Sequence, residues 1–290
     1  MSQLLVYPFI AEFGWHLMMY QGHCRYCSNK FDRTIVFCLK EMEYLYQDFA
    51  TEIHIVSVHG GTPDLWSRGG EYKVTGGELL AKYQAESDAT VKPTKSEMMN
   101  PNIGHHYMPL NKLYGLRAQD GYDLLIHARA DKKKTIYGDR NWPVNKWEKL
   151  VKHLATNSGG HIRMASIGSL GGADHIEGTG DLRGVPIEKL CMHINYAMLT
   201  IGPSSGPIHL ASLCQCPHVV WTDKRIWNLG MGRSGTNRKR YTKVWNPFKT
   251  YVSVIDHEGW QPKFKTVFDE VTHQLNRLTN DGSNERKKTS

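Results

Sequence analysis

The residues from Ala197 to Thr222 constrain the fold of this chain more than any other segment. They read AMLTIGPSSGPIHLASLCQCPHVVWT. An apolar strand, Met198 to Ile201, leads into a turn of small residues, and Pro207 then begins an apolar helix that ends near Cys214. Proline after two serines and a glycine is a strong helix start. Because a second apolar strand, His218 to Trp221, follows at once, the segment predicts half of a βαβ unit in a parallel sheet.

The start of this helix suits a phosphate group. Its first turn offers unpaired backbone N–H groups and the positive end of the helix dipole. Ser204 and Ser205 add two hydroxyls, and Gly206 leaves room for a ligand. An ordinary strand-turn-helix joint with capping serines would have the same composition. His209 on the first helical turn favours a binding site over that alternative.

Three motifs between residues 124 and 222 resemble, in the right order, those of the lipopolysaccharide heptosyltransferase family. The sequence SGPIHLAS, which begins at Ser205, resembles the C-terminal signature of that family. The sequence DLRG, which begins at Asp181 and is followed by IEKL, resembles its "DLxG…LxEL" helix. The sequence RNWP, which begins at Arg140 and is followed by Trp147 and Leu150, resembles its "K-x-W-P…W…L" segment.

Members of this family are glycosyltransferases with the GT-B architecture. The resemblance therefore implies an α/β fold with two Rossmann-like domains, whose parallel sheets face a cleft, and a C-terminal helix that crosses back to the first domain. The N-terminal half resembles the family in its layout only.

The rest of the chain alternates strands and helices as such a fold requires. In the first half we expect strands at Leu4 to Phe9, Arg33 to Leu39 and Glu52 to Val58, and helices at Glu41 to Phe49 and Glu78 to Glu86. In the second half we expect strands at Tyr122 to Ala130 and His161 to Ile167, and helices at Pro143 to Thr156, Pro186 to Tyr196 and Phe264 to Leu278. We predict an acceptor domain over residues 1–120, a nucleotide-sugar domain over 121–279, and a disordered basic tail over 280–290.

The charge and the cysteines bound the class of protein. A net charge of +8 and a pI near 9.1 favour polyanionic partners, whether nucleic acid, anionic lipid or nucleotide phosphates. No apolar run approaches the ~20 residues that span a bilayer, and the N-terminus lacks a basic leader and a cleavage site. Six cysteines with irregular spacing indicate reduced thiols. We expect a cytoplasmic protein, in the host cytoplasm if it is viral, without integral membrane contact.

By resemblance, the donor diphosphate binds at Ser204, Ser205 and Gly206, and His209 lies beside them. A histidine packed under the strand is the alternative for His209. Arg129 and Arg140 are the cations that we expect to face the phosphates. A metal-free site must neutralise the charge of the leaving nucleoside diphosphate with side chains and helix dipoles. For Arg140, an exposed loop arginine is an equal alternative.

The nucleotide's base and ribose, again by resemblance, lie near Gly168, Asp181 and Leu182. The implied co-substrate is a nucleoside-diphosphate sugar, with a UDP-sugar favoured, and no further cofactor is implied. Ser204 stands where heptosyltransferases carry an aspartate that contacts the sugar. We therefore expect a donor sugar other than heptose.

The acceptor hydroxyl needs a general base within hydrogen-bond reach. In GT-B enzymes of this kind the base comes from the first loop of the N-terminal domain, which here reads Glu12-Phe13-Gly14-Trp15-His16. The family has an aspartate directly after the glycine, where this chain has Trp15. Glu12 is therefore the first candidate for the base and His16 the second.

Metal sites find little support in the sequence. There is no D-x-D motif of the metal-dependent GT-A class. His23, Cys24 and Cys27 form one group and Cys214 with Cys216 another, but neither has its matching half at zinc-site spacing.

These observations predict an inverting, metal-independent GT-B glycosyltransferase, a hexosyl- or pentosyltransferase. The favoured acceptor is hydroxymethylated cytosine in phage DNA, because a glycine-containing loop carries six cations: Arg225, Arg233, Arg238, Lys239, Arg240 and Lys243. The competing hypothesis is a transferase that acts on a surface glycan, lipopolysaccharide or capsule. A hypothesis of another class is a non-catalytic module that binds a nucleotide sugar or nucleic acid.

Overall fold

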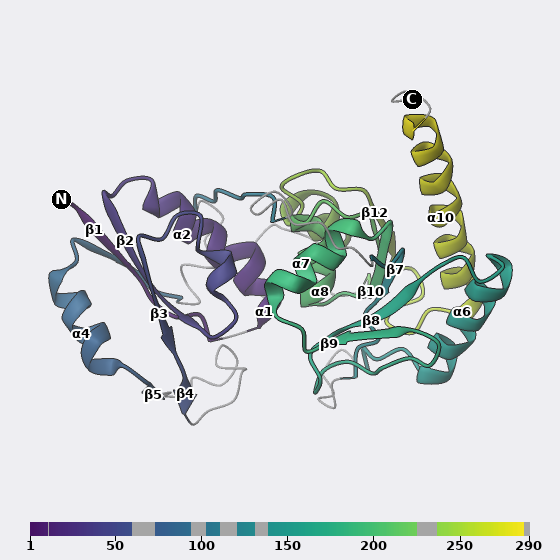
Figure 1. Cartoon of the computed structure of the whole chain (residues 1–290), viewed down its shortest axis with the longest axis horizontal. Helices are drawn as coiled ribbons and strands as arrows, with labels where there is room; N and C mark the ends of the chain where they lie inside the picture. Colours follow the sequence, from purple (N-terminus) through teal and green to yellow (C-terminus); the bar gives the residue numbers. More distant parts are fainter. Residues whose placement is uncertain are drawn as a thin grey trace. The chain divides into compact units, whose positions relative to one another are not determined.

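The computed structural model describes residues 1–10, 12–59, 73–93, 103–110, 121–130, 139–224 and 237–286. The described residues up to Leu110 form one compact unit, and those from Gly121 onward form a second. Each unit contains one parallel sheet with helices packed against it (Figure 1). The protein is therefore an α/β protein with two parallel sheets, which confirms the predicted fold class.

The first sheet has four parallel strands in the order β3-β2-β1-β6. Their bounds are β1 (Gln3–Val6), β2 (Arg33–Leu39), β3 (Glu52–Val56) and β6 (Ala89–Val91). The chain runs from β1 outward to β3 and then returns to β6 on the other side of β1. The strand order thus reverses between β1 and β6, which is where open parallel sheets bind ligands. A short antiparallel pair, β4 (Val58–His59) and β5 (Lys73–Val74), lies outside this sheet.

The segment after β1 is more helical than predicted. A continuous helical stretch is formed by α1 (Phe13–Trp15), the π-turn η1 (His16–Tyr20) and α2 (Gln21–Ser28). The predicted loop from Glu12 to His16 therefore ends at Glu12. The reason is the apolar run after His16, whose side chains are all buried and hold this stretch against the sheet.

Two further helices of the first unit differ in how well they were predicted. α4 (Gly77–Glu86) forms as expected, and its Leu80 and Tyr83 pack on the apolar face of the sheet around Phe37. The helix predicted at Glu41 to Phe49 is only a 3₁₀ turn, η2 (Glu43–Leu45). Glu41 has a φ of 73°, so a helix cannot begin there, and Tyr46 leaves the helical conformation with φ −125° and ψ −15°.

The second sheet has six parallel strands in the order β12-β11-β10-β7-β8-β9. Their bounds are β7 (Leu124–Ile126), β8 (Met164–Gly168), β9 (Gly180–Arg183), β10 (Leu199–Pro203), β11 (His218–Trp221) and β12 (Val252–Ile255). The strand order reverses between β7 and β10. β9 is an edge strand that the sequence analysis assigned to a helical motif.

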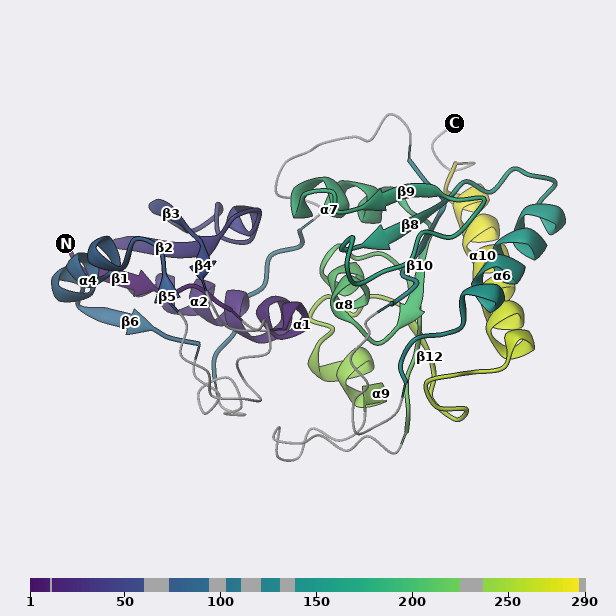
Figure 2. The ribbon, with the colours of Figure 1, turned by 90° about the horizontal axis from the view of Figure 1, so that it is seen from below.

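Helices cover both faces of the second sheet. α6 (Val144–Asn157) and α10 (Phe264–Arg286) lie side by side on one face, and α7 (Ile187–Tyr196) and α8 (Gly206–Leu213) lie on the other (Figures 1 and 2). Two short elements, α9 (Asn237–Lys239) and the π-turn η3 (Arg240–Val244), precede β12. The predicted unit of strand, helix and strand in the opening segment is confirmed as β10, α8 and β11.

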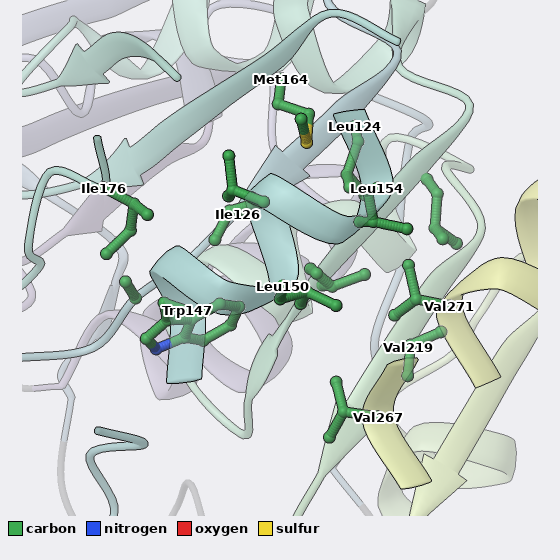
Figure 3. Packing of buried hydrophobic residues seen from close by; sticks show 14 of the residues in the cluster. Leu124, Ile126, Trp147, Leu150, Leu154, Met164, Ile176, Val219, Val267 and Val271 are labelled. Carbon is green, nitrogen blue, oxygen red and sulfur yellow. The ribbon is translucent and has the colours of Figure 1, made fainter. Parts of the chain in front are cut away.

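The main core of the second unit lies between the sheet, α6 and α10. Trp147, Leu150 and Leu154 of α6 point toward the sheet, and Val267 and Val271 of α10 complete the cluster (Figure 3). Three tryptophans, Trp142, Trp147 and Trp221, pack together within it, with ring centroids 4.9–5.4 Å apart.

The last helix extends further than predicted. It runs past Leu278 to Arg286. Its buried residues Val267, Val271 and Leu275 belong to the core of the second unit. No helix in the described ranges is both long and apolar enough to cross a lipid bilayer.

Candidate functional site

The carboxyl ends of β7 and β10 bring the predicted donor residues together. These two strands are neighbours, and the backbone N–H of His127 donates to the carbonyl of Ile201 at 2.9 Å. The loop after β7 leads to Arg140, and the turn after β10 leads into α8. Arg140 donates a hydrogen bond from Nη2 to the backbone carbonyl of Ser204. The two loops therefore meet where the strand order reverses, which is the usual ligand site of such a sheet.

The N-terminus of α8 has the features of an anion site. Ser205 is the residue before the first helical turn, with extended backbone, and its side chain makes no capping hydrogen bond. Its hydroxyl Oγ is buried and has no hydrogen-bond partner among the described residues. A serine in this position ordinarily caps the helix. Here the hydroxyl and the positive end of the helix are both left for a ligand.

His209 lies in an aromatic enclosure beside this helix start. Its ring stacks on Tyr241 with centroids 4.4 Å apart and meets Trp245 edge-on at 4.8 Å. Its Nε2 is 3.2 Å from the hydroxyl of Tyr241, which donates to Oγ of Ser204 at 3.1 Å. Burial, and then the nearby charge of Arg240, hold the pKa of His209 well below its usual range. The ring is therefore neutral at pH 7.

The packed alternative for His209 and the site interpretation both have support in this geometry. The side chain is only 4% exposed. Its Nδ1, however, is buried without a hydrogen-bond partner among the described residues. A buried polar atom left in this way costs about 1–3 kcal/mol, and a bound ligand could supply the missing partner.

The two predicted arginines, Arg129 and Arg140, are held in the same loop region by contacts with neighbouring side chains. The guanidinium of Arg140 stacks over Trp260, with its Cζ 4.6 Å from the ring centroid. Arg129 donates from Nη1 to Oδ1 of Asn141 at 2.8 Å. Because Asn141 follows Arg140 directly, both cations belong to the loop region beside α8. Arg140 is thus held by a carbonyl and an aromatic ring, and is not a freely exposed loop arginine.

Gly168 occupies a position that only glycine fits. Its φ is 129°, and a Cβ there would lie 2.7 Å from Cβ of Ala173 and 2.9 Å from Nδ1 of His127. The residue ends β8 at the carboxyl edge of the sheet, as predicted from its place in the sequence.

Asp181 and Leu182 lie within β9, one strand further out. Asp181 pairs with Ser166 of β8. It stands two residues before Arg183, the last residue of β9. Arg183 binds its carboxylate through two hydrogen bonds of 2.8 Å, and these bonds hold the pKa of Asp181 well below its usual range. The structure thus gives Asp181 a partner in its own strand.

The two candidate bases of the first unit differ in exposure. Glu12 is exposed and begins the helical stretch, where its carbonyl accepts from the N–H groups of Trp15 and His16. His16 is buried, stacks on Phe9 at 4.9 Å, and has its Nε2 2.5 Å from the hydroxyl of Tyr46. Burial lowers its pKa to about 3. Glu12 is therefore the only one of the two with a side chain open to an acceptor.

Tyr241 and Arg240 are neighbours of the start of α8 that were not predicted from the sequence. Both lie on η3, and they were counted with a basic loop. Arg240 stacks over Trp245, and Arg238 is bound to Asp256 by hydrogen bonds of 2.7 and 2.8 Å. Lys239 and Lys243 are exposed. Arg225 and Arg233 lie outside the described residues.

A metal site would require a cluster of His, Cys, Asp or Glu side chains. In the described ranges, no group of three or more such residues is arranged to hold a metal ion. His23 and Cys27 lie close together, with Nε2 3.4 Å from Sγ, whereas Cys24 is buried in the core.

Comparisons with solved structures identify the fold. The chain is similar to the ADP-heptose LPS heptosyltransferase II of E. coli, with a TM-score of 0.59 and 11% identity over 96% of this chain and 99% of that one. It is equally similar to a glycosyl transferase family 9 structure from Veillonella parvula, with a TM-score of 0.59 and 10% identity over 94% and 97% of the two chains. The E. coli heptosyltransferase WaaC with ADP gives a TM-score of 0.51 and 11% identity over 93% and 99%.

At such identities these similarities show the fold alone. The chain has the two-domain GT-B fold of these proteins. No protein-family profile matches the sequence, and no curated protein sequence matches it significantly.

Proposed function

We propose that the protein is an inverting glycosyltransferase that moves a sugar from a nucleoside-diphosphate donor to a hydroxyl acceptor without a metal ion. One observation carries this proposal: the buried hydroxyl of Ser205 has no partner among the described residues, at the N-terminus of α8, where the strand order reverses. Arg140 lies against the same turn. A hydroxyl, a helix dipole and a guanidinium at one point suit a phosphate group.

The proposed roles of the residues follow from where negative charge develops during the reaction. As the bond between sugar and diphosphate breaks, negative charge gathers on the leaving diphosphate, and the N–H groups of α8, Ser205 and Arg140 stabilise it. Gly206 keeps this approach free of side-chain bulk. On the acceptor side, Glu12 takes the proton from the attacking hydroxyl. Glu12 also follows the first strand of a parallel sheet, close to the point where that sheet reverses its order.

Two classes of nucleotide sugar are candidates for the donor. UDP-sugars are our first choice. The similar E. coli WaaC was solved with ADP, which makes ADP-sugars the second class to test. Ser204 is uncharged and its hydroxyl accepts from Tyr241, which supports a sugar other than heptose.

For the acceptor, a surface glycan is better supported than DNA. The similar structures include a lipopolysaccharide heptosyltransferase. None of the three structures compared above is described as acting on DNA. The basic loop that favoured DNA also loses weight, because Arg238 is bound to Asp256 and Arg240 packs beside His209.

The deciding experiment measures the transfer of label to the acceptor from a panel of UDP- and ADP-sugars that are radiolabelled in the sugar. Each donor is incubated with the full chain and either a glycolipid extract or hydroxymethylated DNA. We expect label in the glycolipid. Label found only in the DNA would reverse the assignment of the acceptor. Tight nucleotide binding without transfer to any acceptor would favour the non-catalytic binding module.

A matched pair of variants tests the donor site itself. Ser205→Ala removes the hydroxyl that has no described partner, so we expect a folded protein with weaker nucleoside-diphosphate binding. Ser253→Ala in β12 is the control and should bind like the original protein. Equal affinities in both variants would remove Ser205 from the proposed site.

A further inference from the structure

The π-turn η3 sits next to the start of α8 and has an unusual geometry. The N–H of Trp245 donates to the carbonyl of Arg240 at 2.7 Å, which closes a turn over five residues. Turns of this kind are rare, and they occur frequently at functional sites. Tyr241 of this element contacts Ser204, but no residue of η3 has yet been given a role in binding the phosphates.

The wider turn determines which side chains meet. In an α-helix, residues five apart point about 140° away from each other around the axis. In η3, by contrast, Arg240 stacks directly over Trp245, with Cζ 4.6 Å from the ring centroid. Trp245 is 3% exposed and meets the ring of His209 edge-on. The turn therefore holds the guanidinium of Arg240 in a defined place beside His209.

The neighbouring residue of η3 locks this arrangement to the donor site. Tyr241 stacks on His209 and donates to Oγ of Ser204. Hence η3 contacts the start of α8 through Tyr241, and Arg240, the residue before Tyr241, holds its cation over Trp245 beside His209. Arg240 and Arg140 both disfavour the charged form of His209, which places both cations within electrostatic reach of the same ring.

The two arginines are built alike. Each guanidinium stacks at 4.6 Å on a buried tryptophan, Arg140 on Trp260 and Arg240 on Trp245. A guanidinium that is stacked on an aromatic face keeps its N–H donors in one fixed plane, which suits bidentate binding of a phosphate. Arg240 also donates from Nη1 to Oδ1 of Asn237 at 3.4 Å, and Arg140 from Nη2 to the carbonyl of Ser204. Two such cations at one helix start fit two phosphates better than one.

We propose that Arg240 is a second phosphate-binding residue of the donor site and that, together with Arg140, it makes the site selective for a nucleoside diphosphate over a monophosphate. This inference rests on the proposed function, since it takes the ligand to be a nucleotide. It also gives a reason for the π-turn, which positions Arg240 through Trp245.

Calorimetric titration of the full chain tests the inference. UDP and UMP, and ADP and AMP, are titrated into the original protein, Arg240→Met, Arg240→Lys and Lys243→Met. Lys243 is an exposed cation of the same turn and serves as the matched control. We expect Arg240→Met to lose about 10- to 100-fold in affinity for the diphosphate while the monophosphate changes little. Arg240→Lys should recover part of the loss, and Lys243→Met should show none.

The outcomes separate this inference from the proposed function. If the original protein binds no nucleoside diphosphate, the proposed function fails and the inference fails with it. If the original protein binds and Arg240→Met keeps the same preference for diphosphate over monophosphate, only the inference is overturned. Equal losses for both nucleotides, with a lower melting temperature, would show that Arg240 acts on the fold through Trp245, which also overturns it.

Discussion

Arg140 donates a hydrogen bond to the backbone carbonyl of Ser204, and it thereby joins the loop after β7 to the start of α8. A second contact holds this loop in place. Trp142 is 2% exposed, and its indole Nε1 donates to the carbonyl of Pro262 at 2.9 Å. An arginine held between a carbonyl and Trp260 needs little reorganisation to bind an anion.

Replacing Arg140 should weaken donor binding. For Arg140→Met we expect a loss of about 10- to 100-fold in nucleoside-diphosphate affinity, since hydrogen bonds to charged groups contribute about 1.5–3 kcal/mol. Titration calorimetry measures this loss. Arg163→Met is the control, because Arg163 precedes β8 and lies at the opposite edge of the sheet. A loss of the same size in both variants would mean that general charge, and not Arg140, attracts the nucleotide.

Glu12 and His16 should respond differently to substitution. Glu12→Gln should lower kcat by about 10²- to 10⁴-fold and leave nucleotide affinity unchanged, because the side chain acts only on the acceptor proton. His16→Ala should chiefly lower stability, since it opens a cavity against Phe9 and removes a partner of Tyr46. Turnover and melting curves of both variants check this. If neither change affects transfer, the general base lies elsewhere in the chain.

Stability should fall as the pH drops from about 6.5 toward 4. His16, His127 and His218 are buried and neutral, and burial lowers their pKa values from 6.5 to about 3, 4 and 4. In this window the unfolded chain takes up protons that the folded protein does not. The free energy of unfolding should therefore decrease by up to about 1.4 kcal/mol per pH unit for each histidine.

Urea unfolding between pH 7 and 4.5 measures this slope. His218→Gln should make the slope shallower by one histidine's share. A slope that stays the same in this variant would mean that other groups cause the acid sensitivity.

The ion pair of Arg25 and Asp48 should be important to the first unit. The side chain of Arg25 is 3% exposed, and it binds Asp48 through hydrogen bonds of 2.7 and 2.9 Å and the carbonyl of Leu45 at 3.1 Å. Arg25→Met should cost about 3–5 kcal/mol, because a poorly solvated carboxylate is left behind. The half-buried pair of Arg33 and Glu52, whose side chains are 35% and 32% exposed, gives the comparison, and Arg33→Met should cost less than about 1 kcal/mol. Equal costs in urea unfolding would contradict the assigned role of burial.

Cys27 should be the thiol that reacts in the folded protein. The other five cysteines are buried, whereas Cys27 is half-buried. His23 bonds through Nδ1 to the carbonyl of Gly104 at 2.9 Å, which leaves Nε2, 3.4 Å from Sγ of Cys27, to accept the thiol proton. Iodoacetamide followed by mass spectrometry should find one labelled site, and His23→Ala should label more slowly. Labelling of Cys24 before Cys27 would contradict this expectation.

The segments with strong local signals could be predicted from the sequence. The small-residue turn and Pro207 specify the joint between β10 and α8, and Trp147, Leu150 and Leu154 of α6 have the spacing of a buried helical face. Gly168 marks a strand end, where its positive φ is needed. Each of these features depends on residues within a few positions of one another.

The features that escaped prediction depend on distant contacts. Tyr241 reaches His209 across 32 residues, and nothing in the sequence around Tyr241 distinguishes it from an exposed residue in a basic loop. β9 reads GDLR, which lacks the apolar alternation of a strand, and it forms by pairing with β8. His16 is a polar residue at the start of an apolar run, and its burial depends on Tyr46 in another segment.

The π-turn η3 makes the length of the chain part of the recognition of the donor. If this turn took the ordinary α-helical form at its present length, Arg240 and Trp245 would point about 140° apart, although every side chain would be unchanged. Removing one residue between them would instead leave the two residues four apart, on one face of an α-helix. Among relatives of this protein, an arginine and a tryptophan four apart in an α-helix would therefore be the equivalent of Arg240 and Trp245 in the π-turn.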